Sequence, residues 1–105
     1  MDIQFNTDSS VEGKQALEVY MSETISEALA RFSDKITRIE VHVSNENGEK
    51  KSPNDKKCVL EARLKGLDPI AVTGSGDTIK LAVTSAITKI KAALDTTLGR
   101  LSNKR

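Results

Sequence analysis

The 105-residue sequence contains no tryptophan, a single cysteine, a single histidine and two prolines. Its only aromatic residues are Phe5, Tyr20 and Phe32, so the core has to consist mainly of isoleucine, valine, leucine and alanine. Because Cys58 has no second cysteine to pair with, an internal disulfide is excluded, and a reducing compartment is weakly favoured. A single histidine, His42, excludes a metal site built on a histidine pair.

Long apolar runs are also missing. No segment approaches the roughly 20 consecutive apolar residues needed to cross a bilayer. The first five residues include neither the basic segment nor the apolar run of a secretory signal peptide. We therefore expect a cytoplasmic protein with no membrane partner. With 37% hydrophobic and 30% charged residues, the composition is typical of a globular chain, and residues 1–105 fit one domain.

Apolar and polar residues alternate in three segments, which predicts strands over residues 1–7, 37–44 and 57–65. A fourth, short strand is expected over residues 70–73. The side chains expected to face the core are Ile3, Phe5, Ile39, Val41, Val43, Cys58, Leu60, Ala62 and Leu64. The side chains expected on the opposite face are Gln4, Arg38, Glu40, His42, Glu61, Arg63 and Lys65. Residues 45–56 are nearly free of apolar side chains and predict a long hairpin loop.

Two segments have apolar residues at helical spacing. The first helix is expected over about residues 13–32, after a capping box formed by Ser9 and Glu12. Its apolar stripe comprises Leu17, Met21, Ile25, Ala28 and Phe32. The second is expected from about residue 78 to residue 98 or 101, with Ser75 or Asp77 as N-cap and Gly99 near its end. Its stripe comprises Val83, Ala86, Ile87, Ile90, Leu94 and Leu98.

The element order is therefore β-α-β-β-β-α, which predicts an α+β fold. Both amphipathic helices would cover one face of a four-stranded sheet. The other face would remain polar and either solvated or directed toward a partner.

Catalytic constellations are scarce. Cys58 and His42 fall on opposite faces of the predicted sheet, which argues against a Cys–His pair. The segment Gly74-Ser75-Gly76 lacks the Gly-Lys-Ser/Thr ending of a nucleotide-binding loop, so a simple turn is the favoured interpretation. Glu18, Glu23 and Glu27 form a solvated helix face rather than a metal site. We therefore expect no enzyme activity, no cofactor, no metal and no small-molecule substrate.

Basic residues offer a more specific hypothesis, although 16 basic and 15 acidic residues leave a net charge of only +1. If strands and second helix present their cations together, they form a phosphate-binding surface; solubilising charge is an equally good explanation. The scarcity of aromatics favours recognition of RNA shape and backbone over base stacking. The candidate RNA-binding residues are Lys35, Arg38, Arg63, Lys65, Lys80, Lys89, Lys91, Arg100 and Lys104.

Several segments together resemble the ribosome hibernation-promoting factor family, which includes ribosome-associated inhibitor A and proteins labelled sigma-factor modulation proteins. The opening strand over residues 1–5 is similar to that family's first strand. Residues 32–43, which read Phe-Ser-Asp-Lys-Ile-Thr-Arg-Ile-Glu-Val-His-Val, resemble the run that leads into its second strand. The Gly76-Asp77 step and residues 81–90 resemble the start of its last helix.

This resemblance implies a β-α-β-β-β-α domain that binds ribosomal RNA of the small ribosomal subunit, in the channel used by mRNA and tRNA. It implies inhibition of translation and protection of idle ribosomes during stress or stationary phase, by occupancy alone. It also implies a protein that is monomeric when it is not bound to the ribosome.

The chain departs from the family pattern at Glu18, Thr24 and Glu27 of the first helix, where the family has basic residues, and at the diluted basic C-terminus. Two alternatives therefore stay open. One is a double-stranded RNA-binding domain that acts outside the ribosome, because the element order is close to that of such domains. The other is a protein-interaction module on the same fold.

Overall fold

The computed structural model describes residues 1–8, 11, 13–45 and 55–103 of the chain. Its elements follow the predicted order. They are β1 (Asp2–Thr7), α1 (Lys14–Ala28), the 3-10 turn η1 (Ala30–Phe32), β2 (Ile36–Asn45), β3 (Lys56–Leu64), β4 (Ile70–Gly76) and α2 (Ile79–Asn103). Most of the predicted loop over residues 45–56 falls on residues 46–54, which lie outside the described residues.

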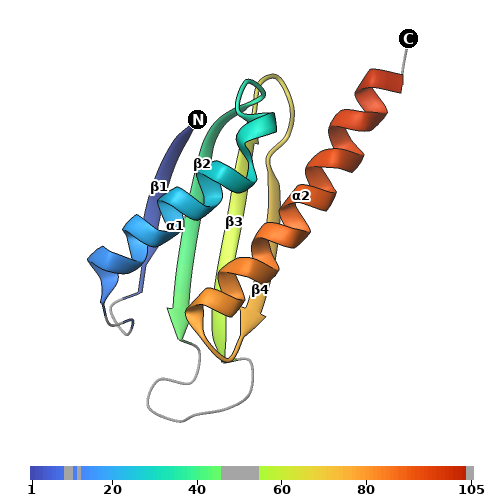
Figure 1. The fold of residues 1–105 in the computed structure, drawn as a ribbon. Helices are drawn as coiled ribbons and strands as arrows, with labels where there is room; N and C mark the ends of the chain where they lie inside the picture. The colour runs from blue at the N-terminus through green and yellow to red at the C-terminus, as the bar shows by residue number, and fades with distance from the viewer. Residues whose placement is uncertain (9–10, 12, 46–54, 104–105) are drawn as a thin grey trace.

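The four strands form one sheet in the order β1-β2-β3-β4. β1 runs parallel to β2, and the other neighbouring pairs are antiparallel. Parallel neighbours require a crossover connection, which α1 provides. Both helices cover the same face of the sheet, with α2 on β3 and β4, and the last turns of α2 extend beyond the sheet (Figure 1). The predicted α+β fold is therefore confirmed.

The core lies between this sheet face and the two helices. Every strand residue predicted to face inward is buried or half-buried, and Ile39, Leu60 and Ala62 have no exposed surface. The helix stripes close the core from above: Met21, Ile25, Val83, Ala86, Ile90 and Leu94 are fully buried. Alternation in the first three strands and helical periodicity in the two helices were therefore sufficient to identify the core faces of these elements.

The first helix is shorter than predicted. α1 ends at Ala28, and the chain continues through η1, which still delivers the Phe32 side chain to the core. The residue before α1, Gly13, has a φ of 65°, and no side chain caps the helix there. The predicted capping box of Ser9 and Glu12 lies outside the described residues.

The fourth strand is longer than predicted. Gly74, Ser75 and Gly76 belong to β4, not to a turn, and pair with the start of β3. The N-cap prediction was wrong as well, since the Thr78 hydroxyl accepts a hydrogen bond from the backbone N–H of Leu81 at 3.1 Å. Neither Ser75 nor Asp77 is therefore the N-cap residue of α2. In the sequence, Gly74 and Gly76 indicated a turn. In the fold, they allow β4 and the start of α2 to pack closely.

The second helix continues past Gly99 to Asn103, beyond both predicted ends at residues 98 and 101. A glycine inside a helix costs only about 1 kcal/mol relative to alanine. Packing of Leu94 and Leu98 against the core favours continuation through this position. Among the described residues, no helix is both long and apolar enough to span a membrane.

Candidate nucleic-acid interface

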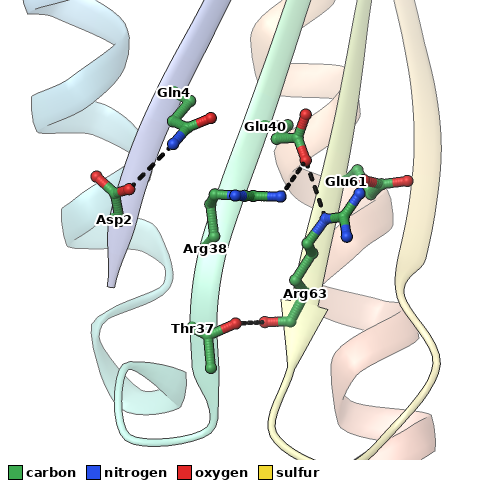
Figure 2. Close-up of polar contacts among 7 residues, drawn as sticks. All are labelled: Asp2, Gln4, Thr37, Arg38, Glu40, Glu61 and Arg63. Carbon is green, nitrogen blue, oxygen red and sulfur yellow. Dashed lines mark hydrogen bonds and ion pairs between the residues drawn. The ribbon is translucent and has the colours of Figure 1, made fainter.

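The open face of the sheet, opposite the helices, carries the two predicted arginines. Arg38 of β2 and Arg63 of β3 are direct cross-strand partners, and Glu40 and Glu61 form the next such pair. Opposite charges therefore meet diagonally, as Figure 2 shows. The Glu40 carboxylate accepts hydrogen bonds from Arg38 at 3.1 Å and from Arg63 at 2.9 Å. Arg63 also forms an ion pair with Glu61 at 3.2 Å.

These contacts change the proton affinity of Glu40. Partial burial by itself raises the pKa of the carboxyl group, but hydrogen bonds from Arg63 and Arg38 and their positive charges outweigh it. The pKa of Glu40 therefore lies below its ordinary value. Because the carboxylate stays ionised, the centre of the open face is a mixed-charge network rather than a purely positive surface.

Two lysines lie at the adjoining end of the sheet. The Lys65 backbone N–H donates a 3.1 Å hydrogen bond to the Lys35 carbonyl oxygen, which joins the turn before β2 to the turn after β3. Both side chains are exposed and make no ion pair within the described part of the chain. With Arg38 and Arg63 they bring four of the predicted cations to one corner, although Asp34 and Asp68 occupy the same turns.

Three more of the predicted cations lie on α2, on the other face of the sheet. The Lys80 ammonium group sits 4.9 Å from the centre of the Tyr20 ring of α1. Lys89 donates a 2.8 Å hydrogen bond to the Thr73 carbonyl oxygen and so covers part of the exposed edge of β4. Lys91 is half-buried and makes no ion pair among the residues that the structure describes.

The predicted cations thus form two groups on opposite sides of the sheet, one at the strand corner and one on α2. Arg100 belongs to α2, but its side chain, like all of Lys104, lies outside the described residues. Whether either group binds RNA stays a prediction. Alternation placed Glu40 and Glu61 on the same face as the arginines, but it did not predict that these carboxylates bind the arginine side chains.

A further contact had no sequence signal. Arg31 of η1 donates two hydrogen bonds from one nitrogen, Nη2, to the two carboxylate oxygens of Asp95 in α2, at 2.6 and 2.8 Å. The two residues are 64 positions apart. No periodicity relates the two residues, so only the folded chain reveals this contact between η1, which follows α1, and α2.

The residues with potential for chemistry are separated. His42 is exposed on the open face and Cys58 is buried in the core, as alternation predicted. Burial raises the pKa of the Cys58 thiol to about 12, which removes it as a nucleophile at neutral pH. Among the described residues, no group of three or more His, Cys, Asp or Glu side chains could hold a metal ion.

Comparison with protein families gives a match to the model described as sigma 54 modulation protein / S30EA ribosomal protein, over residues 4–102. The chain belongs to this family. The S30EA family match spans both helices and all but the first residues of the sheet, and it confirms the resemblance identified in the sequence. None of the curated proteins compared with the chain matches it.

Two solved structures share the S30EA fold with this chain. The N-terminal domain of Protein Y from Thermus thermophilus superposes with a TM-score of 0.72 at 14% identity, covering 92% of this chain and 99% of that one. A ribosomal subunit interface protein from Coxiella burnetii gives a TM-score of 0.69 at 22% identity, covering 94% and 99%. At these identities the likeness establishes the fold.

Proposed function

We propose that this protein binds the small ribosomal subunit without catalysing a reaction, at ribosomal RNA of the channel that mRNA and tRNA occupy. Occupancy of that channel inhibits translation and protects idle ribosomes under stress or in stationary phase. The observation that carries the proposal is the S30EA family match over residues 4–102. The similar structure described as a ribosomal subunit interface protein supports it.

The structure distinguishes among the cations that would serve this function. Arg38 and Arg63 already share the Glu40 carboxylate, so a phosphate has to compete with it. Lys35, Lys65 and Lys91 have no such competitor within the described residues. Each phosphate neutralised by a lysine releases counterions, which makes the affinity fall with salt. We therefore assign the main phosphate contacts to these three lysines.

Co-sedimentation with purified small subunits over a range of salt concentrations tests the proposal. The wild-type protein should pellet with subunits at low salt and be released as salt rises. Lys91→Gln and Lys35→Gln/Lys65→Gln should each weaken binding and reduce the salt slope by about one per lost phosphate contact. Lys14→Gln, which removes an exposed lysine of α1 outside the predicted set, is the matched control.

Three outcomes would count against the proposal. Wild-type protein that stays in the supernatant at low salt would remove it. Equal binding to free duplex RNA and to intact subunits in a gel-shift assay would favour a double-stranded RNA-binding domain instead. Binding that leaves cell-free translation unchanged would separate ribosome association from inhibition.

A further inference from the structure

A groove runs between α1 and the edge strand β1, away from both groups of predicted RNA-binding cations. It is shallow and open to solvent, with a volume of about 370 Å³. Its lining residues are Phe5, Gln15, Glu18, Val19, Ser22 and Glu23. In Figure 1, α1 crosses the sheet on the side of the edge strand β1.

The helix side of the groove is a single face of α1. Gln15, Val19 and Ser22 are spaced by four and three residues, which places them on one side of the helix. Val19 is 58% exposed, the largest exposed fraction among the large apolar side chains that the structure describes. From the sheet side, the half-buried Phe5 packs against the core. The groove therefore has an apolar floor that water covers in the free protein.

The strand beside the groove has an open edge. β1 stands at one end of the sheet order and pairs with β2 through its other edge. An edge strand presents backbone N–H and C=O groups to which an extended segment of another protein can hydrogen-bond. Side chains of such a segment point alternately to the two sheet faces, so every second one would reach the groove.

The charge of the groove is negative. Glu18 is fixed there by a 2.9 Å hydrogen bond from the Thr7 hydroxyl group to its carboxylate. Glu23 is exposed and makes no ion pair within the described residues. One more turn along the helix, Glu27 is exposed as well. This surface repels phosphate and attracts lysine and arginine side chains.

We propose that this groove is a docking site for an extended, basic segment of a partner protein. The backbone of the segment pairs with the free edge of β1, and one of its apolar side chains packs between Phe5 and Val19. Its lysine or arginine side chains meet Glu18 and Glu23. The site is distinct from the cation groups considered for RNA, so the protein carries two binding surfaces of opposite charge.

The test uses the full-length, isotope-labelled protein and a short synthetic peptide of the repeat Lys-Ser-Leu-Ser, whose lysines and leucines share one face of an extended strand. Titration should shift backbone amide resonances of β1 and of α1 between residues 15 and 23. Glu23→Lys should weaken binding about tenfold at low salt, because it reverses a charge at the site. Val19→Ser should weaken it about fivefold through loss of apolar contact. Both side chains are exposed, so both variants should keep the wild-type fold.

Asp68→Lys is the matched control, with the same charge reversal at an exposed carboxylate in the turn between β3 and β4, at the other side of the sheet from β1. It should change the affinity by no more than about twofold. An acidic peptide of the repeat Glu-Ser-Leu-Ser should not bind. Because the assay contains no ribosome, its outcome is independent of the function proposed above.

Several results would overturn the proposal. They are equal affinity of wild-type protein and Glu23→Lys, equal binding of a lysine–serine peptide, and resonance shifts confined to other surfaces. A free protein that dimerises in sedimentation experiments and becomes monomeric with Val19→Ser would make a second copy the occupant. Competition of a short RNA for the same resonances would make the groove part of an RNA surface.

Discussion

Gly74 of β4 lies against Ala86 of α2 with no room for a side chain between them. A Cβ atom built on Gly74 would come 2.3 Å from the Ala86 backbone nitrogen and 2.3 Å from the Ala82 carbonyl oxygen. Neither group can move without displacing the helix. A glycine at this strand position therefore sets how closely α2 approaches the sheet, and with it the placement of the cations that α2 carries.

Gly74→Ala should lower the free energy of unfolding by about 1–3 kcal/mol, since the added methyl group forces α2 away from β4. Urea denaturation followed by circular dichroism measures the change. The control is Gly99→Ala, where no atom lies within 4 Å of the added Cβ. Because Gly99 is inside a helix, that variant should be more stable, by about 0.5–1 kcal/mol. Equal effects of the two substitutions would refute the close-approach explanation.

The Arg31–Asp95 contact should couple the end of α1 to α2. A double-mutant cycle with Arg31→Ala and Asp95→Ala should give a coupling of about 0.5 kcal/mol, within the range for an exposed ion pair, because both side chains are at least half exposed. The Arg31 guanidinium also lies 4.3 Å from the centre of the Phe32 ring. Arg31→Ala should therefore cost more than Asp95→Ala. Zero coupling at low salt would show that the pair contributes nothing.

Glu40 should give the stability a pH dependence on the acid side. Its folded-state pKa lies below the ordinary value of 4.5, so the unfolded chain takes up the proton first as the pH falls. The stabilisation is complete above the ordinary pKa and is lost as the pH drops through the folded-state value. The stability difference between wild-type protein and Glu40→Gln should therefore shrink below pH 4.5 in urea titrations.

The Arg38→Gln/Arg63→Gln background provides the control for this measurement. Without the two guanidinium groups, only partial burial acts on the Glu40 carboxyl group, and burial raises its pKa. In this background, the stability difference caused by Glu40→Gln should depend less on pH or should depend on it in the opposite direction. An unchanged dependence would mean that groups other than these arginines cause it.

Cys58 should be inert toward thiol reagents in the folded protein. Burial raises the pKa of its thiol from 9.0 to about 12, so its thiolate fraction at pH 8 is about a thousandfold smaller than in the unfolded chain. A disulfide reagent with a coloured leaving group should react promptly in urea and slowly in buffer. Prompt reaction without urea would place Cys58 at the surface.

Part of the candidate site followed from the sequence. Strict alternation around Ile39 and Leu60 identified the inner face, and therefore placed Arg38, Glu40 and Arg63 on the outer one. Alternation does not specify the distance between side chains on different strands. Register decides that distance, and it put Arg63 within reach of Glu40, whereas Arg38 lies two residues before Glu40 on the same strand.

Glycines and exposed apolar residues were harder to interpret. Gly74 and Gly76 looked like a turn, because a sequence does not show whether a glycine serves a bend or a close approach. Val19 lies outside the apolar stripe predicted for α1, and nothing nearby in the sequence signals that it faces the β1 edge. The groove arises only when β1 and α1 are packed together.

The sequence alone determined the element order, the inward faces and the family resemblance, because these depend on periodicities of two and 3.6 residues and on short segments read in order. Tertiary structure alone decided which charges pair, where the predicted cations separate into two groups, and where an acidic groove opens beside β1. Those features depend on contacts between elements that are far apart in the chain. Local periodicity carries no information about such contacts.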